Sequence, residues 1–230
     1  NFNVVAVATS EKSLDSVRDI ENIHPFCSDI SDEKSIEKLY EFVISKFGHA
    51  DVLVNNAGIH MDNILLRMKS EEWNQVMNVN LNGPFHLTKT VLKDMVKNKN
   101  GRIINISSIA GEYGNIGQVN YSSMKSALSG MTKTLSKELG RYKINVNGVA
   151  FGVIETRLTQ ATDEKKTIVV DGNEVGVGIP EKVSAGFAKM IPLGRSGTAA
   201  EAADGVYLFC IPESNYISGQ MMVVGGGLRM

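Results

Sequence analysis

The chain has 230 residues, of which 43% are hydrophobic and 21% are charged, and its formal net charge at pH 7 is -1. This length and apolar content allow one substantial core, and a nearly neutral chain offers no electrostatic basis for binding nucleic acid or an anionic membrane. No apolar run reaches the ~20 residues of a membrane-spanning helix, and no HxxxH or CxxC pair supports a metal site.

Apolar segments of strand length alternate with helical patterns from end to end, which predicts a parallel sheet with helices on both faces. In chain order, the expected strands are Val4–Ala8, Ile23–Cys27, Val52–Val54, Arg102–Ile106, Ile144–Val149 and Met221–Val224. The expected helices are Asp32–Phe47 with Ser31 as its N-cap, Ser70–Met77, Asn80–Val96, Tyr121–Leu139 and Ala199–Phe209. No repeat, low-complexity tract or linker divides the chain, so we expect residues 1–230 to form one domain.

The two cysteines, Cys27 and Cys210, lie in apolar segments far apart in the sequence. We expect them to be buried, reduced thiols rather than a disulfide. Reduced thiols suit a reducing compartment such as the cytoplasm.

Tyr121 and Lys125 stand on one face of a predicted helix, and Ser108 precedes them at the end of a predicted strand. A neighbouring ammonium favours the phenolate, so we expect the pKa of Tyr121 to fall toward neutrality. Tyr121 would then donate a proton to a developing alkoxide, while Ser108 hydrogen-bonds the same oxygen. This pattern indicates carbonyl reduction, although the Tyr-x-x-x-Lys spacing alone also occurs by chance in many helices.

Further motifs accompany these residues in a characteristic order. They are Asn55-Asn56-Ala57-Gly58 after the third strand, Asn80-Leu81 in a helix, Ser108 with Tyr121 and Lys125, and Ile154-Glu155-Thr156 after the fifth strand. With these motifs the chain resembles the short-chain dehydrogenase/reductase family over nearly its whole length. Within the family, it is similar to the 3-oxoacyl-[acyl-carrier-protein] reductases at Ala8-Thr9-Ser10-Glu11, Ala57-Gly58-Ile59, Asp62-Asn63 and Arg67-Met68-Lys69. The resemblance implies a single-domain, Rossmann-like, doubly wound α/β fold.

The resemblance also implies catalytic roles for Asn80, Ser108, Tyr121 and Lys125. Asn80 would hold a water that links Lys125 to solvent, so that Tyr121 can be reprotonated, and Lys125 would bind the nicotinamide ribose. Ser107, the neighbour of Ser108, is expected only to satisfy local backbone.

The backbone of Ile154 and the side chain of Thr156 would hold the nicotinamide carboxamide. Asn56, Ala57 and Gly58 follow a strand at the carboxyl edge of the sheet, where open α/β folds bind ligands. Gly58 would let the backbone approach the cofactor, and the asparagine amides would brace neighbouring strands. An ordinary Asn-rich turn is the alternative for this tetrapeptide.

Thr9 and Ser10 end the first strand, where an NAD-binding fold usually has a carboxylate. Hydroxyl donors and the nearby Lys12 favour the 2′-phosphate of NADPH, whereas Glu11 opposes it. Alternatively, Thr9 and Ser10 cap the next helix. Asp29, followed by Ile30, resembles the family acid that hydrogen-bonds the adenine.

The sequence departs from the family at its start, because Asn1 falls within the family's second strand. The first strand, the glycine-rich loop that binds pyrophosphate and the first helix are absent, so we expect a fragment with exposed strand edges in mid-sheet.

Two departures are internal. Phe151 replaces the family's proline and would place its ring over the cofactor edge. The substrate-lid region, about residues 157–191, is long, and its segment 167–175 reads as a hairpin that turns at Asp171-Gly172.

The expected activity is NADPH-dependent reduction of a 3-oxoacyl thioester of acyl carrier protein or coenzyme A. Basic residues would attract an acidic carrier protein: Lys97, Lys99, Arg141 and Lys143. A homotetramer is expected because apolar residues lie around much of the circumference of two helices: Leu87, Val91, Met95, Ala127, Met131 and Leu135. One stripe would face the sheet and the remainder another subunit; alternatively, all of them fill the core of one monomer. The segment Ile217–Met230 would form a second contact. The alternatives are a reductase of the same family acting on another carbonyl or secondary alcohol, and a non-catalytic assembly subunit.

Overall fold

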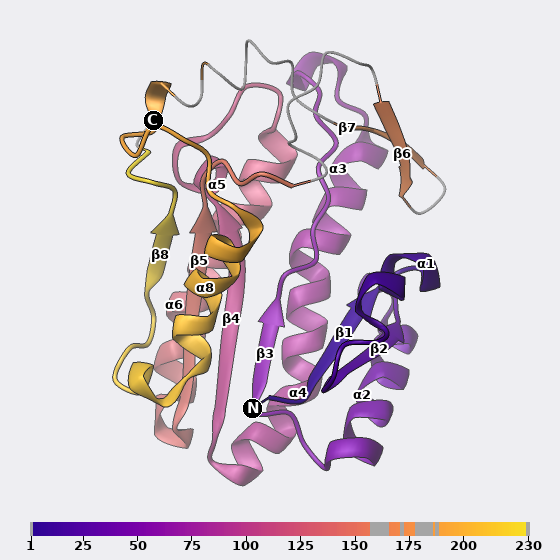
Figure 1. Cartoon of the computed structure of the whole chain (residues 1–230), viewed down its shortest axis with the longest axis vertical. Helices are drawn as coiled ribbons and strands as arrows, with labels where there is room; N and C mark the ends of the chain where they lie inside the picture. Colours follow the sequence, from indigo (N-terminus) through magenta and orange to yellow (C-terminus); the bar gives the residue numbers. More distant parts are fainter. Residues whose placement is uncertain (1, 157–165, 171–172, 178–185, 187–188, 229–230) are drawn as a thin grey trace.

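The computed structural model describes residues 2–156, 166–170, 173–177, 186 and 189–228 (Figure 1). Most of the expected lid therefore lies outside the described residues. No described helix is long and apolar enough to cross a membrane.

A four-stranded parallel sheet forms the centre of the molecule, in the order β3-β4-β5-β8. Its strands are β3 (Val52–Asn55), β4 (Gly101–Ser108), β5 (Ile144–Phe151) and β8 (Met221–Val224). Three of the eight residues in each of β4 and β5 are isoleucine or valine, and both strands are largely buried, as expected for central strands covered on both faces. The predicted strands are confirmed, and the two central ones extend two residues further at their carboxyl ends.

The two N-terminal strands, β1 (Val4–Ala8) and β2 (Ile23–Cys27), pair in parallel with each other. Within the described residues, neither pairs with β3, and Figure 1 shows the β1–β2 pair standing apart from it. Val4, Val7 and Val54 are exposed. The expected exposed edges in mid-sheet are therefore present.

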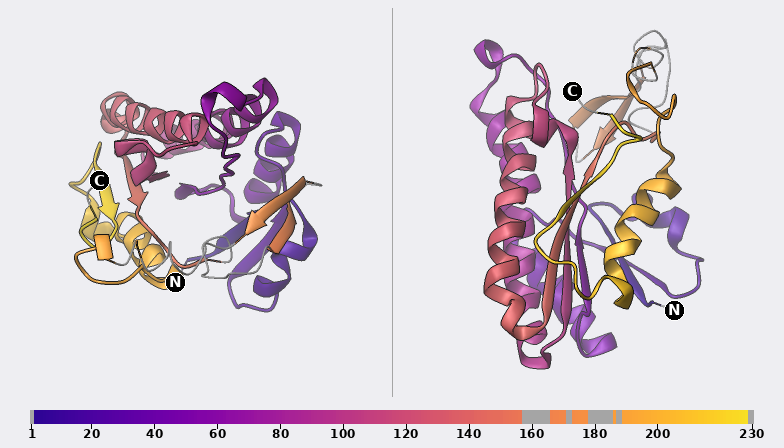
Figure 2. Two further views of the ribbon diagram at one scale, coloured as in Figure 1. Left: turned by 90° about the horizontal axis from the view of Figure 1, so that it is seen from above. Right: turned by 90° about the vertical axis from the view of Figure 1, so that its left-hand side faces the viewer.

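Helices cover both faces of the central sheet (Figure 2). The helices α4 (Gly83–Asn98) and α6 (Val119–Leu139) pack on one face, with α2 (Glu33–Phe47) beside α4. The other face is covered by α8 (Ala199–Cys210). This arrangement confirms the doubly wound α/β fold.

Several helix boundaries differ from the prediction. The N-cap of α2 is Asp32, whose carboxylate accepts a hydrogen bond from the Lys34 amide at 3.2 Å, because Ser31 instead bonds to Asp29. The helix α3 (Ser70–Met77) continues into a π-helix, Asn78–Asn82, before α4 begins. Two short helices, α1 (Glu11–Leu14) and α5 (Ile109–Tyr113), were not predicted.

The predicted hairpin is confirmed by β6 (Lys166–Val170) and β7 (Asn173–Val177), which pair antiparallel with Val170 opposite Asn173. The expected turn residues, 171–172, lie outside the described residues.

The main core lies between the sheet and the α4–α6 layer. It consists of Leu53, Val91, Met95, Ile103, Leu139, Ile144 and Val146. Leu87 and Leu135 pack against it. Val91 and Met95 therefore belong to the apolar stripe that faces the sheet, since both side chains are buried within one protomer.

A second core cluster lies on the α8 side and contains Ile104, Ile106, Val149 and Phe209. Phe151 packs against this cluster, so the expectation that its ring lies over the cofactor edge is wrong. The reason is that β5 continues through Phe151, where it pairs with Val224, and the strand directs the ring into the core.

Candidate active site

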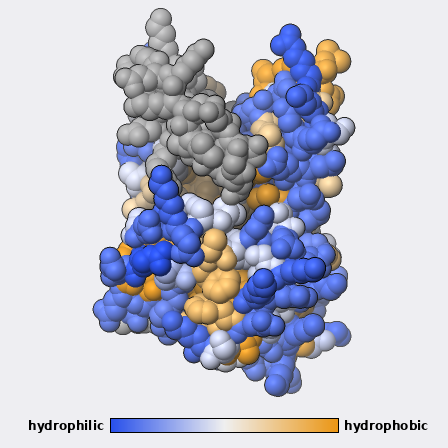
Figure 3. Space-filling view, turned by 90° about the vertical axis from the view of Figure 1, so that its right-hand side faces the viewer, coloured by the Kyte–Doolittle hydropathy of each residue, from blue (hydrophilic) through white to orange (hydrophobic). Residues whose placement is uncertain are grey.

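The carboxyl ends of β3, β4 and β5 meet at the upper edge of the sheet in Figure 1, next to α5 and the start of α6. In the space-filling view of Figure 3, this edge lies toward the upper end of the molecule. The predicted catalytic residues gather here, as expected for an open α/β sheet.

Lys125 is buried, with 4% of its surface exposed, and its Nζ donates a 2.8 Å hydrogen bond to the carbonyl of Ile106. Burial lowers the pKa of its ammonium to about 8. A Cβ added to Gly58 would lie 3.2 Å from this Nζ and 3.3 Å from Asn80 Oδ1. The glycine therefore allows the chain after β3 to approach the ammonium closely.

Tyr121 lies one turn before Lys125 on α6, and the Lys125 Nζ is 5.6 Å from the centroid of its ring. Burial raises the pKa of the Tyr121 phenol, the Ser108 hydroxyl lowers it in part, and the charge of Asp62 raises it again. The expectation of a lowered pKa is therefore wrong. Burial removes water that would stabilise the phenolate, and the hydrogen bond to Ser108 only partly compensates for that loss. Tyr121 therefore stays protonated at neutral pH.

Ser108 ends β4 and begins α5, where its Oγ accepts a hydrogen bond from the Ala110 amide at 3.2 Å. Gly111 brings α5 against α6, since an added Cβ would lie 2.8 Å from backbone atoms of Lys125 and Ser126. This close crossing holds Ser108 beside Tyr121. Ser107 donates instead to the Lys125 carbonyl on α6 at 2.8 Å, so it bonds to backbone 18 residues away and not to the local backbone that was expected.

Asn80 lies in the π-helix and is fully buried. Its side chain accepts from the Ile59 amide and donates to the Ile59 carbonyl, both at 2.8 Å. Both ends of this amide therefore bind the loop after β3, which fixes that loop next to Lys125. The expected water link remains a prediction.

A buried amide network ties the strands to both helices behind the site. Asn55 Nδ2 donates to Thr88 Oγ1 at 3.1 Å and to Asn105 Oδ1 at 2.8 Å, and Asn105 Nδ2 donates to Thr132 Oγ1 at 2.8 Å. The predicted bracing role of the Asn55 amide is thus confirmed. Asn56, Ala57 and Gly58, by contrast, are exposed along the carboxyl edge.

Sequence reasoning missed a second group of residues, which attaches the loop after Gly58 to the start of α6. Asn120 Nδ2 donates to the Met61 carbonyl at 2.9 Å, and Gln118 Nε2 donates to Asp62 Oδ2 at 2.9 Å. His60 contacts Asp62 at 3.2 Å and lies perpendicular to the Tyr121 ring. The only signal was the short spacing of His60 and Asp62 after the glycine motif.

The expected cofactor residues at the other end of the edge are accessible. Thr9 and Ser10 are exposed, and the Ser10 hydroxyl contacts the Ser13 hydroxyl at 2.9 Å without making a side-chain cap of α1. The Glu11 carboxylate accepts a 2.7 Å bond from Arg18, which neutralises the charge that opposed a 2′-phosphate.

Asp29 is exposed, and its Oδ1 accepts bonds from the Ser31 amide and hydroxyl at 2.8 and 2.7 Å. Ile30 is buried, and its side chain packs under Gly83. Ile154 forms a β-bridge with Gly197, and Thr156 is exposed.

The basic residues expected to attract a carrier protein lie at the wrong end of the molecule. Lys97 and Lys99 end α4 just before β4 begins, and Arg141 and Lys143 follow α6 just before β5. The 8 residues of β4 separate this edge from Ser108 by ~25 Å. Lys99 and Lys143 have φ of 49° and 59°, so both serve as left-handed helix caps.

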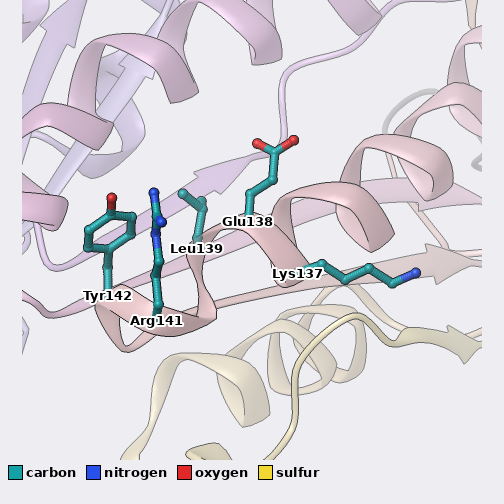
Figure 4. A pocket seen from close by; sticks show the side chains of 5 residues that line it. All are labelled: Lys137, Glu138, Leu139, Arg141 and Tyr142. Carbon is teal, nitrogen blue, oxygen red and sulfur yellow. The ribbon is translucent and has the colours of Figure 1, made fainter.

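A shallow pocket of about 460 Å³ also lies at that end, lined by Lys137, Glu138, Leu139, Arg141 and Tyr142 (Figure 4). Figure 4 shows Arg141 and Tyr142 side by side, with the guanidinium 4.7 Å from the ring centroid, while Lys137 extends away. This pocket is separate from the catalytic edge.

Among the described residues, no three metal-ligating side chains come together. Both cysteines are free thiols, but Cys27 is exposed, contrary to expectation, and its Sγ contacts the Thr9 carbonyl. Cys27 is the last residue of β2, which among the described strands pairs only with β1.

A family profile described as short chain dehydrogenase matches residues 1–167. The chain belongs to the short-chain dehydrogenase family. It is 41% identical over 230 residues to the 3-oxoacyl-[acyl-carrier-protein] reductase FabG of Thermotoga maritima, covering 98% of this chain and 87% of the relative. The protein of the same name from Escherichia coli is 38% identical, covering 99% and 87%, and that of Haemophilus influenzae is 39% identical, covering 99% and 88%. This short-chain dehydrogenase is therefore an oxidoreductase similar to the 3-oxoacyl-[acyl-carrier-protein] reductases.

Proposed function

We propose that the protein reduces a 3-oxoacyl thioester, carried by acyl carrier protein or coenzyme A, to the 3-hydroxyacyl thioester with NADPH. One observation carries the proposal: Ser108, Tyr121 and the buried ammonium of Lys125 converge at the carboxyl edge of the sheet. The relatives named as 3-oxoacyl-[acyl-carrier-protein] reductases support the substrate class.

The donor set fits a nicotinamide cofactor. An ammonium has three donors, and within the described residues Lys125 Nζ uses one of them, toward the Ile106 carbonyl. Two donors remain for the ribose hydroxyls, and the cofactor supplies the hydride when bound. The remaining contacts are assigned to residues along the same edge: Asp29, Ile30, Asn56, Ala57, Gly58, Ile154 and Thr156.

The residues at the end of β1 support the proposed preference for NADPH. Thr9 and Ser10 offer exposed hydroxyls there, Lys12 is close in sequence, and Glu11 is paired with Arg18. A 2′-phosphate thus meets donors and a neutralised carboxylate, whereas NADH would find no free carboxylate among these residues for its 2′-hydroxyl.

Tyr121 is the proton donor. Its phenol stays protonated because burial raises its pKa, so it can deliver a proton when negative charge develops on the substrate carbonyl oxygen. Ser108 hydrogen-bonds the same oxygen and stabilises that charge in a site of low polarity. Lys125, whose pKa is about 8, keeps a positive charge beside the phenol below that pH. Asn80 fixes the loop that contains Gly58. Its second proposed role is to hold the water through which the proton would be replaced.

Replacing Tyr121 with phenylalanine tests the mechanism, because it removes the proton and keeps the ring. We expect kcat/KM for acetoacetyl-coenzyme A with NADPH, followed by NADPH absorbance in the full-length protein, to fall by ~10²–10⁴-fold. Tyr113→Phe is the matched control, since Tyr113 is an exposed tyrosine of α5. Turnover by Tyr121→Phe at the rate of this control would contradict the proposal.

We also propose that the protein assembles as a homotetramer. Exposed apolar side chains on α4 and around α8 support two contact surfaces, apart from the stripe of α4 that faces the sheet. Phe85 on α4 is 51% exposed, and α8 with the chain that follows it exposes Tyr207, Leu208, Tyr216, Ile217 and Val223. Two different two-fold contacts generate a tetramer.

A further inference from the structure

His60 lies on the loop between β3 and α3, and hydrogen bonds to two other parts of the chain hold this loop in place. Asn80 binds both backbone groups of Ile59, Asn120 binds the Met61 carbonyl, and the Asn63 amide donates to the Gly117 carbonyl at 2.8 Å. The residues on either side of His60 are therefore fixed relative to the start of α6. The imidazole has a defined place next to the active-site tyrosine.

The His60 imidazole takes part in a chain of polar contacts that ends at α6. Its Nδ1 lies 3.2 Å from Asp62 Oδ1, and Asp62 Oδ2 accepts from Gln118 Nε2 at 2.9 Å. Gln118 in turn accepts from Asn115 at 3.0 Å. The His60 ring centroid is 6.4 Å from that of Tyr121, and the two planes meet at 84°. The ion pair thus lies against the phenol that donates the proton.

We propose that His60 is a positioning residue of the reductase site. Asp62 holds the His60 ring next to the ring of Tyr121. The His60 imidazolium offsets the negative charge of Asp62, so the Tyr121 phenol is a stronger acid than it would be beside an unpaired carboxylate. The inference rests on the proposed function, because it concerns the proton that Tyr121 delivers. It assigns the group His60–Asp62–Gln118 a role in setting the pH dependence of reduction.

The charges near the phenol support this role. The hydrogen bond that His60 donates to Asp62 raises the pKa of His60, although burial lowers it. Burial raises the pKa of Asp62, but the bonds from His60 and Gln118 outweigh burial and lower that pKa. The charge of Asp62 raises the pKa of Tyr121. Other ionisable groups lie on this loop and next to it: Arg67 and Lys69 on the loop, Glu72 on α3 and Lys125 on α6. Glu72 accepts from the Lys69 amide and from Asn63.

The sign of the effect follows from these charges. At a pH below the raised pKa of His60, the imidazolium balances Asp62 and the phenol gives up its proton more readily. Above that pKa the carboxylate is unbalanced, so reduction slows. One unit charge near a partly buried site, acting on a partial proton transfer, changes the rate by ~3–10-fold. Lys125 adds a second decline near its own pKa of about 8 in every variant that retains it.

The test compares pH profiles of kcat/KM for acetoacetyl-coenzyme A with NADPH in four full-length proteins: wild type, His60→Gln, Asp62→Asn and His60→Gln/Asp62→Asn. His60→Gln keeps a side chain that can donate to Asp62 but cannot gain a charge. We expect kcat/KM of this variant to be ~3–10-fold lower than that of wild type at low pH. The fall in kcat/KM that wild type shows as His60 loses its proton should be absent from the variant. The double variant has no carboxylate left to balance, and it should recover most of the lost activity.

Proton NMR of the His60 ring supplies a reading that does not depend on turnover. Its pKa should be raised in the wild type and should fall in Asp62→Asn. If the role of His60 were purely structural, His60→Gln would lower kcat/KM at all pH values, and adding Asp62→Asn in the double variant would not restore it. That result, or superposable wild-type and His60→Gln profiles, would overturn the inference while leaving the reductase function intact. Absence of turnover in the wild type would instead overturn both.

Discussion

Replacing Gly111 with alanine probes the crossing of α5 and α6, which brings Ser108 next to Tyr121. The new Cβ would lie 2.8 Å from the carbonyl carbon of Lys125 and 2.8 Å from the amide nitrogen of Ser126. Both are backbone atoms of the helix turn that carries the ammonium. No side-chain rotation can relieve these contacts, so the two helices must move apart.

Two opposing effects set the size of the change. Alanine in place of glycine within a helix stabilises by ~0.5–1 kcal/mol, whereas overpacking a close contact costs ~1–3 kcal/mol. Because the contacts involve backbone, we expect overpacking to dominate and the free energy of unfolding to fall by ~1–2 kcal/mol. Moving α5 away also moves Ser108, and a displacement on the order of 1 Å lowers kcat/KM by ~10²-fold.

Urea unfolding at one fixed protein concentration, together with the NADPH assay, measures both effects. Gly140→Ala is the control, because Gly140 has φ of -56° and no described atom lies within 4 Å of its added Cβ. This control should gain ~0.4–1 kcal/mol and keep full activity. A Gly111→Ala protein that matches the control in stability and turnover would refute the reasoning.

Three further predictions concern charge, cofactor and assembly. Lys125→Met should abolish activity yet raise the free energy of unfolding at pH 7. Because burial lowers the pKa of Lys125 in the folded state, the gain in stability over wild type should shrink as the pH rises from about 8 toward ~10.5. Urea titrations at pH 7 and pH 10 that show the same gain would contradict this prediction. Thr9→Asp should repel the 2′-phosphate and shift the ratio of kcat/KM values from NADPH toward NADH, so an unchanged ratio would rule out Thr9 as part of that site. In sedimentation at micromolar concentration the full-length protein should behave as a tetramer, and an active monomer would disprove the assembly alone.

Local sequence patterns were enough to place most of the framework. The apolar runs of β4 and β5 and the helical spacing of α2 and α6 depend on neighbouring residues, so strands and helices could be located within a few positions. The four-residue spacing of Tyr121 and Lys125 put both on one helix face for the same reason. Errors at this level were local, such as the N-cap of α2, where Ser31 and Asp32 were both capable and the competing bond of Ser31 to Asp29 was not visible.

The electrostatic properties of the site depended on segments far apart in the chain. The pKa of Tyr121 could not be judged from Lys125 alone, because burial and the charge of Asp62, contributed by the loop after β3, outweigh the nearby groups. The basic residues after α4 and α6 suggested a carrier-binding surface, but the parallel strands that follow carry the chain ~25 Å before the catalytic edge is reached. The order of residues places these basic side chains at the amino ends of β4 and β5 and Ser108 at the carboxyl end of β4, but spacing along the chain does not show how far apart the folded chain holds them.

The same limit applies to the contacts of His60 with Tyr121 and of Asn55 with Asn105. Each contact joins residues that come together only when β3, β4 and α6 pack. A polar side chain in the sequence does not by itself indicate which residue it will contact. The spacing of apolar residues along the sequence shows which face of a helix or strand is buried. The partners of buried polar groups, and therefore the acidity of the catalytic phenol, are set by tertiary packing.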